Sequence, residues 1–290
     1  MIELPPSFLA MPRWWTEGAD WLAALPANAA AQCERWDLKL DGEVAHGSNA
    51  IVLPVLRYGE PLALRLSPPG AEVTEQIHAL RWWNGHGMVR LVDADADRGA
   101  MLLERLGAPL TGVPLDESIA ILGGLMRRLA ISGDPMSLST ATMARRRAGE
   151  FGPQWDRLGS PFDKSWLRAA EQLGAGPLAT AERDLAVNGD FHADQVLRGA
   201  REPWLVVDPV LYRGDIEFDL ARILWTSLDK MQTDADILEH FGTLVETAAL
   251  DSDRARDWVV YRTVDYYLWG LGAGLTEDPV RCRRLLQVFL

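Results

Sequence analysis

The spacing of apolar residues changes character once along this chain, near residues 105–109. Before that point, apolar runs are short and are separated by turn-forming segments such as His46–Asn49 and Tyr58–Pro61, which is typical of antiparallel strands. After it, most segments repeat apolar residues at the three- and four-residue spacing of a helix face. The change predicts an α+β fold with a β-rich N-terminal lobe of residues 1–106 and a mostly helical lobe of residues 107–290.

The same periodicity predicts the individual elements. In the first lobe we expect an antiparallel meander, two further strands and one helix: Trp36–Leu40, Ala50–Leu56, Leu62–Leu66, Val89–Val92 and Ala100–Glu104 as strands, and Ala71–Trp83 as the helix. In the second lobe we expect seven helices: Asp116–Ile131, Ser139–Glu150, Asp163–Gly174, Ile216–Leu228, Asp234–Ala249, Asp251–Leu271 and Pro279–Leu290. Three short strands are also expected there: Leu185–Val187, Val196–Leu197 and Trp204–Val207.

Charge and cysteine content exclude several classes of protein. The chain carries 41 acidic and 29 basic residues, and this balance is the reverse of what a phosphate backbone attracts, so we expect no nucleic-acid partner. Cys33 and Cys282 are too few for a disulfide framework or a zinc site, which favours the reducing cytoplasm. The sequence shows no apolar run of membrane-spanning length and no signal peptide.

The segment of residues 184–225 carries the chemistry. Asp190 lies in a loop between two apolar strands, Asp208 follows the apolar run Trp204–Val207, and Asp219 begins an apolar helix. A carboxylate at such places is costly without a partner, and three of them brought together would repel one another. A divalent cation would offset that repulsion, and ligands that are all oxygen favour Mg²⁺.

Three motifs in this segment resemble the aminoglycoside phosphotransferases, most closely the streptomycin 6-kinase and hydroxyurea phosphotransferase group. Residues 188–195 read Asn-Gly-Asp-Phe-His-Ala-Asp-Gln, where the family has His-Gly-Asp-x-His-x-x-Asn. Asp208-Pro209 matches the metal-binding Asp, and residues 214–221 match Gly-Asp-x-x-x-Asp-Leu-Ala. The resemblance extends over residues 36–270.

The resemblance implies a protein-kinase-like fold whose first lobe binds ATP (or GTP), while the second lobe binds the acceptor and carries the catalytic residues. Asp190 would orient the acceptor hydroxyl and take its proton, and Asp208 would bind Mg²⁺. Asp219 would brace the catalytic loop by hydrogen bonding, as would Asn188 and His192. The backbone of Glu104–Leu106, with Glu104 and Leu106 at its ends, would receive the adenine.

The chain departs from the family pattern at three positions. Asn188 replaces the first His of the motif, which should change how the loop is anchored. Gln195 replaces the Asn that binds the second metal, and it offers a similar oxygen on a longer side chain. Arg65 stands where the family has a phosphate-binding Lys, and its acidic partner would be Glu75 or Glu72, of which we prefer Glu75.

Other polar residues have less distinctive surroundings. Ser48 belongs to a turn that could cradle phosphate or simply close a hairpin. Four carboxylates could line a pocket for a cationic acceptor, although each alone is typical of a solvated surface or a helix start: Asp194, Asp215, Glu217 and Asp265.

The sequence therefore predicts a kinase that phosphorylates a hydroxyl of a small, polar, amine-bearing molecule, either aminoglycoside-like or an amino sugar, with antibiotic inactivation as one role. A metabolic kinase of the same fold is the first alternative. A catalytically weak nucleotide-binding protein is the second, because Arg65 and Gln195 both depart from the family pattern.

Overall fold

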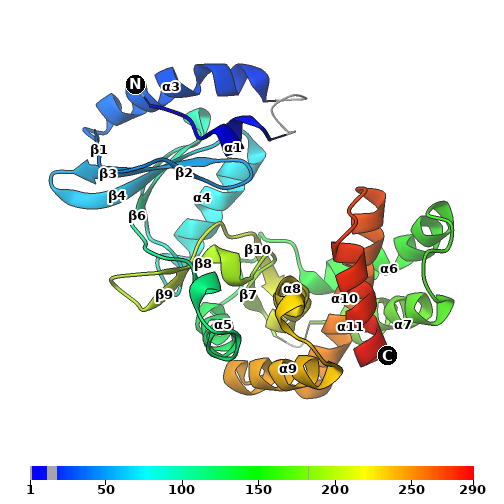
Figure 1. Ribbon diagram of the computed structural model, residues 1–290. Helices are drawn as coiled ribbons and strands as arrows, with labels where there is room; N and C mark the ends of the chain where they lie inside the picture. Colours follow the sequence, from blue (N-terminus) through cyan, green and yellow to red (C-terminus); the bar gives the residue numbers. More distant parts are fainter. Residues whose placement is uncertain (1, 12–17, 182) are drawn as a thin grey trace. The chain divides into compact units, whose positions relative to one another are not determined.

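The structure is a computed structural model that describes residues 2–11, 18–181 and 183–290 (Figure 1). The chain divides into two compact units. Unit 1 contains Met1–Gly107 together with Gly199–Leu205, and unit 2 contains Ala108–Arg198 and Val206–Leu290. Each unit has its own core and is described by itself.

Unit 1 is built on an antiparallel sheet with the strand order β1-β3-β4-β6-β5, and β2 pairs with the outer part of β3. The neighbouring strands β1, β3 and β4 form the antiparallel meander expected from the sequence, and of the two further strands β6 pairs with β4 while β5 lies at the edge of the sheet. Its strands are β1 (Lys39–Leu40), β2 (Ala45–His46), β3 (Ile51–Arg57), β4 (Glu60–Leu66), β5 (Leu91–Asp95) and β6 (Ala100–Glu104).

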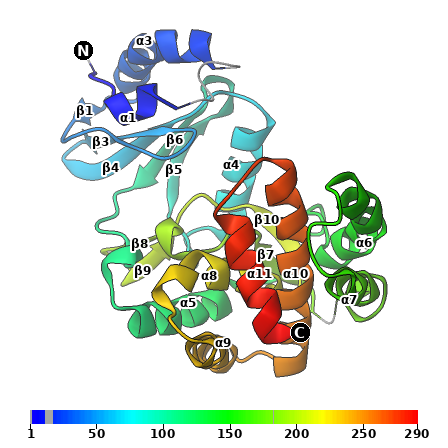
Figure 2. The same ribbon diagram turned by 45° about the vertical axis from the view of Figure 1, so that its right-hand side comes forward.

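Helix α3 (Ala19–Arg35) covers one face of this sheet (Figures 1 and 2). Its buried Leu25 and Ala29 join a core with alternate residues of β3 and β4, and the short helix α1 (Pro6–Leu9) adds Phe8. Helix α4 (Ala71–Trp83) has the predicted bounds, and it ends at Asn84 in the left-handed conformation. Helix α3 was not predicted from the sequence.

Unit 2 is mostly helical. Helices α6 and α7 pack side by side, as do α5 with α9 and α10 with α11 (Figure 2). All seven expected helices are present with shifted ends: α5 (Leu115–Leu129), α6 (Thr140–Arg157), α7 (Lys164–Ala175), α8 (Leu220–Ser227), α9 (Asp234–Ala248), α10 (Ser252–Gly272) and α11 (Asp278–Phe289). Residues 216–219 of the expected fourth helix form the 3₁₀ turn η5 (Ile216–Asp219).

Two small two-stranded ladders complete the fold. β7 (Leu185–Asn188) pairs with β10 (Leu211–Gly214), which the sequence analysis did not predict, in a register that places Leu211 opposite Asn188. β8 (Val196–Arg198) and β9 (Trp204–Val206) form the second ladder. These strands hold the residues between them, 189–195 and 207–210, next to one another.

Candidate active site

The loop after β7 is fixed by the side chain of Asn188. This side chain is 1% exposed, and its Oδ1 accepts hydrogen bonds from the backbone N–H groups of Val210 (3.1 Å) and Asp190 (3.5 Å). The backbone N–H of Gly189 also donates to Val210 O at 2.9 Å. Asn188 thus anchors the loop to the segment before β10, although it replaces the histidine of the family motif.

Residue 189 has to be glycine because the fold leaves no room for a side chain at this position. A Cβ at this position would lie 2.2 Å from Cε2 of the Tyr212 ring, so no larger residue fits beneath that ring. Its φ is not in the left-handed region, so glycine is needed here for its small size and not for its backbone freedom. Because Tyr212 belongs to β10, this close contact places the loop directly against that strand.

Asp190 is held through both of its carboxylate oxygens. Oδ1 lies 2.7 Å from Nε of Arg222, and Oδ2 accepts a hydrogen bond of 2.9 Å from Nε2 of Gln195. The side chain is nevertheless 38% exposed, so its remaining lone pairs are open to a small molecule. A carboxylate with fixed orientation and free acceptor capacity is suited to bind a hydroxyl group and to receive its proton.

Arg222, in α8, is a site residue that the sequence analysis missed. Its guanidinium carbon lies 5.7 Å from the ring centroid of Trp225 and 5.8 Å from that of Tyr266, and these two rings are stacked 4.3 Å apart. The sequence offers one signal for it: Arg222 is a basic residue near the start of an apolar helix, and it directly follows the Asp-Leu-Ala of the motif. No pattern in the sequence indicates that its partner is Asp190.

His192 lies beside the same arginine. Its Nε2 is 3.5 Å from Nη2 of Arg222, and because a guanidinium only donates, Nε2 is the accepting nitrogen of this contact. Nδ1 lies 3.2 Å from Asp194, and this interaction lowers the pKa of the Asp194 carboxyl. The surroundings of His192 are those of a residue that supports the loop.

Asp219 lies beneath the loop and is 3% exposed. Burial raises the pKa of Asp219 well above its usual range, the charge of Arg262 opposes this effect, and the nearby Asp190 adds to it. The carboxyl group of Asp219 also accepts a hydrogen bond from the backbone N–H of Asn188. Asp219 therefore ties η5 to the end of β7.

Asp208 and Gln195 belong to adjoining segments, because the backbone N–H of Val207 donates to Gln195 O at 2.8 Å. Asp208 has a φ of 49°, a left-handed conformation that is uncommon for residues other than glycine and is often found at functional sites. The Gln195 amide must point its NH₂ toward Asp190, since a carboxylate only accepts. Its Oε1 is then buried without a hydrogen-bond partner among the residues that the structure describes.

These residues fit a magnesium ion. In residues 2–11, 18–181 and 183–290, no three His, Cys, Asp or Glu side chains are grouped to hold a metal. Mg²⁺ in a kinase needs only one or two protein ligands, because phosphate oxygens and water complete its shell. The unpartnered Gln195 oxygen and the Asp208 carboxylate are donors of the required kind.

Two of the four carboxylates assigned to a cationic acceptor are structural. Asp215 is 1% exposed, and its Oδ2 accepts from Nε and Nη2 of Arg254 and from Nε1 of Trp258. Glu217 is also 1% exposed and is paired with Arg183, and burial raises the pKa of its carboxyl. The substrate assignments of Asp215 and Glu217 were therefore wrong: both are inaccessible.

Asp265 and Asp194 differ in their accessibility. Oδ1 of Asp265 accepts from Nε and Nη2 of Arg147 at 3.0 and 2.8 Å, and Oδ2 lies 3.5 Å from Arg262. Its side chain is 15% exposed, whereas that of Asp194 is 69% exposed. Of the four carboxylates, only Asp194 is largely open to solvent.

The predicted nucleotide-binding residues all lie in unit 1. Arg65 is 3% exposed, and its guanidinium donates to Ser67 Oγ (3.1 Å) and to Asn49 Oδ1 (3.4 Å). Asn49 in turn donates to Glu72, which was the less favoured of the two acidic partners. Glu75 is exposed on α4, and its pairing with Arg65 stays a prediction.

The remaining positions of this group lie at strand ends. Ser48 is exposed in the tight β2–β3 turn, which is closed by a bond from Gly47 N–H to Ala50 O. Glu104 ends β6, and its carboxylate accepts from the backbone N–H of Arg90 and from Arg201. Leu106 follows the strand and is half-buried. Their nucleotide contacts stay predictions.

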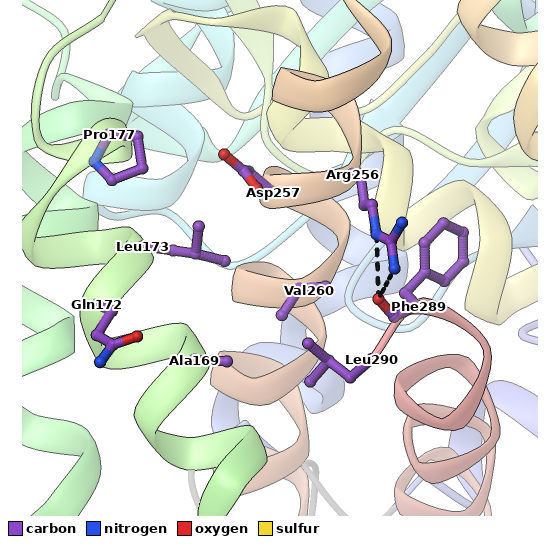
Figure 3. Close-up of a pocket in the computed structure, with 9 residues that line it drawn as sticks. All are labelled: Ala169, Gln172, Leu173, Pro177, Arg256, Asp257, Val260, Phe289 and Leu290. Carbon is purple, nitrogen blue, oxygen red and sulfur yellow. Dashed lines mark hydrogen bonds between the residues drawn. The ribbon is translucent and has the colours of Figure 1, made fainter.

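A hollow of about 300 Å³ lies among α7, α10 and the end of α11 (Figure 3). Figure 3 shows Asp257 above Leu173 and Val260, with the Arg256 guanidinium turned to the backbone oxygen of Phe289. None of the predicted site residues lines it. This hollow is therefore separate from the catalytic loop.

Comparison with known proteins gives concordant results. The model of a family described as "Aminoglycoside/hydroxyurea antibiotic resistance kinase" matches residues 35–274. A streptomycin 6-kinase of Streptomyces griseus is 36% identical over 273 residues, which cover 90% of this chain and 87% of the relative. A hydroxyurea phosphotransferase of Kitasatospora aureofaciens is 32% identical over 281 residues, covering 94% and 81%.

The fold is shared with solved structures. A thermostable mutant of aminoglycoside phosphotransferase APH(4)-Ia, in a ternary complex with AMP-PNP and hygromycin B, superposes with a TM-score of 0.62 at 14% identity. The alignment covers 89% of this chain and 97% of that one. The predicted protein-kinase-like fold is confirmed. No helix in the described ranges combines the length and apolar character needed to span a bilayer.

Proposed function

Since this chain belongs to the family of aminoglycoside/hydroxyurea antibiotic resistance kinases, we propose that it phosphorylates a hydroxyl group of an aminoglycoside-like or amino-sugar acceptor. The family resemblance inferred from the three motifs is confirmed, and the chain is a phosphotransferase. The phosphoryl donor in this proposal is ATP (or GTP), with Mg²⁺ as the accompanying cation.

The observation that carries the proposal is the arrangement around Asp190. Arg222 and Gln195 each hold one oxygen of its carboxylate, and more than a third of the side chain remains exposed. A hydroxyl that donates to a free lone pair of Asp190 would keep the lone pairs of its own oxygen free to attack the γ-phosphorus of the donor. As the new P–O bond forms and the bond to the leaving diphosphate breaks, the hydroxyl proton passes to the Asp190 carboxylate.

Mg²⁺, when bound, would neutralise charge on the β- and γ-phosphates. In this proposal the Asp208 carboxylate and the Oε1 atom of Gln195 are its ligands from the protein. Gln195 then has two tasks, because its NH₂ group orients Asp190 while its oxygen faces the ion. Arg65, in unit 1, would bind phosphate oxygens.

The structure supports a positively charged acceptor less strongly than the sequence did. Three of the four carboxylates expected to bind an amine are paired with arginines, and only the exposed Asp194 remains as a partner for a cation. An amine-bearing acceptor therefore stays our proposal on the strength of the family. A neutral acceptor is the second candidate, favoured by those arginine pairs and by the hydroxyurea phosphotransferase relative.

A phosphate-acceptor screen tests this function. Purified protein with ATP or GTP and Mg²⁺ is offered streptomycin, amino sugars, amino alcohols, hydroxyurea and neutral sugars, and nucleoside diphosphate release is measured. We expect turnover with at least one amine-bearing acceptor and slower turnover as salt concentration rises, because partly exposed ion pairs are screened. If only neutral acceptors react, the second candidate is correct. If none of these acceptors stimulates turnover, the proposed acceptor class is wrong.

Magnesium dependence is a separate prediction. Nucleotide affinity should fall sharply in EDTA and in Asp208→Ala, and only moderately in Gln195→Ala, because Gln195 offers a neutral ligand. The measurement is calorimetric titration of AMP-PNP into each protein with and without Mg²⁺. Asp229→Ala, which removes an exposed carboxylate that pairs with Arg281, is the control and should bind like the parent protein. Equal affinity with and without Mg²⁺ would contradict the assignment.

Arg65 gives a prediction about the donor site. Loss of a charge-assisted contact to phosphate costs roughly 1.5–3 kcal/mol, so Arg65→Ala should raise the nucleotide KM about ten- to a hundredfold. The acceptor KM should stay nearly unchanged. Because Arg65 is buried against Ser67 and Asn49, the thermal stability of each variant must be measured alongside. Arg65→Lys should recover part of the loss, and a normal nucleotide KM in a folded Arg65→Ala protein would rule out the phosphate role.

A further inference from the structure

The turn that joins β2 to β3 in unit 1 is fixed at its start and open at its tip. Nε2 of His46 lies 2.7 Å from Oγ of Ser7 in α1, and Nδ1 of His46 donates to the backbone oxygen of Gly47 at 3.0 Å. At the tip, a Cβ added to Gly47 would meet no atom within 4 Å apart from its neighbours in the chain, and Ser48 is exposed. The turn is therefore held in place while its tip leaves room for a ligand.

Asn49 fixes the other end of this turn through both atoms of its amide. Its Oδ1 accepts from Nη2 of Arg65 in β4 at 3.4 Å, and its Nδ2 donates to Oε1 of Glu72 in α4. A guanidinium only donates and a carboxylate only accepts, so these two partners allow one orientation of the amide. One side chain thus joins the turn to a strand residue and a helix residue that lie 16 and 23 positions away from it in the chain.

Among side chains of similar size, only an amide satisfies both partners of Asn49. A leucine has a similar volume, but it offers no acceptor to Nη2 of Arg65 and no donor to Glu72. An aspartate would accept from Arg65, but its charge would repel the Glu72 carboxylate. Arg65 is 3% exposed, and a hydrogen bond to a buried charged group contributes more than one at the surface. The contact with Asn49 should therefore affect where the guanidinium lies.

From these contacts we infer that Asn49 is a positioning residue for the binding of the nucleotide phosphates, without being a phosphate ligand itself. It holds the Arg65 guanidinium and the β2–β3 turn in one arrangement, and the Glu72 carboxylate polarises the amide that faces the arginine. The inference rests on the proposed function, in which Arg65 binds phosphate oxygens, and deepens it by naming the residue that orients Arg65. Groups that are fixed before binding lose less conformational entropy on binding, so nucleotide affinity should depend on Asn49.

Calorimetric titration of AMP-PNP (or of GMP-PNP if GTP is the donor) with Mg²⁺ and without an acceptor tests the inference. Asn49→Leu removes both hydrogen bonds and Asn49→Asp sets two carboxylates against each other, so each should raise the Kd roughly fivefold or more. Glu72→Gln alone should have a smaller effect, because its amide oxygen still accepts from Asn49. The double variant Asn49→Asp with Glu72→Gln restores both contacts and the net charge, since the glutamine then donates to the aspartate, which accepts from Arg65. Its Kd should lie within about threefold of the parent value.

The free nucleoside distinguishes the positioning of phosphate-binding groups from a general distortion of unit 1. Adenosine (or guanosine) has no phosphate, so its affinity, measured by saturation-transfer NMR, should be the same in Asn49→Leu and in the parent protein. Asn28→Leu is the matched control, because Asn28 is exposed on α3 of the same unit, and it should bind the nucleotide analogue like the parent. Thermal unfolding of each variant establishes that it is folded at the temperature of the titration.

Three outcomes would each overturn the inference: an unchanged analogue Kd in folded Asn49→Leu, an equal loss of affinity for the nucleoside, or a double variant that binds as weakly as Asn49→Asp. If Asn49→Leu does not fold, the comparison of Asn49→Asp with the double variant decides. In turnover, Asn49→Leu should raise the nucleotide KM and leave the acceptor KM nearly unchanged. A protein that shows these binding effects but phosphorylates nothing would refute the proposed function alone. A parent protein that binds neither AMP-PNP nor GMP-PNP would refute both.

Discussion

Asp190→Asn should keep the fold and nucleotide affinity while lowering kcat by about two orders of magnitude or more. The physical reason lies in the contacts of the carboxylate. Oδ2 accepts a hydrogen bond from Gln195 and Oδ1 forms an ion pair with Arg222, whereas an asparagine is neutral, has one oxygen and would turn its NH₂ toward one of these two side chains. The substitution therefore removes the proton acceptor and also misdirects the group that orients the hydroxyl.

The measurement is steady-state turnover of the best acceptor, together with calorimetric titration of the nucleotide. Asp184→Asn is the matched control, because Asp184 is exposed in the same segment, where it pairs with Arg213. Its kcat should stay within about twofold of the parent, since exposed ion pairs contribute little. If a folded Asp190→Asn protein kept near-parental kcat, Asp190 would not be the catalytic carboxylate.

Asp215→Asn should be the most destabilising of the substitutions considered, at about 3–5 kcal/mol of unfolding free energy. Asp215 and Arg254 are 1% and 7% exposed, and removal of the carboxylate charge leaves the guanidinium buried without its counter-ion. The loss of stability should extend beyond this ion pair, because Arg254 also donates to the backbone oxygens of Pro177 and Thr180. It thereby joins α10 to the segment that precedes β7.

Urea unfolding monitored by tryptophan fluorescence measures this effect, with Trp258 as an internal reporter that donates to Asp215. Asp229→Asn is the control, because its partner Arg281 is held on the surface and such pairs are worth less than about 1 kcal/mol. A raised acceptor KM with unchanged stability in Asp215→Asn would instead restore the substrate role that the sequence suggested.

Local sequence patterns predicted most of the helices and strands and the order of the motifs around Asp190. The bounds of α4 and β6 follow from local periodicity and end signals such as Asn84, and those signals act over a few residues. The placement of Asp190 between two short strands is similarly local. Helix α3 and strand β10 were not predicted, and β10 becomes recognisable as a strand only through its pairing with β7.

The roles of the other carboxylates were decided by the tertiary structure. Asp194, Asp215, Glu217 and Asp265 are alike in sequence, yet one is exposed and the others are paired with arginines that lie 34 to 118 positions away. Whether a carboxylate can meet a substrate depends on its burial and on the cation beside it. Burial and the neighbouring cation both depend on how helices that are distant in the sequence pack together, so a local sequence pattern cannot predict them.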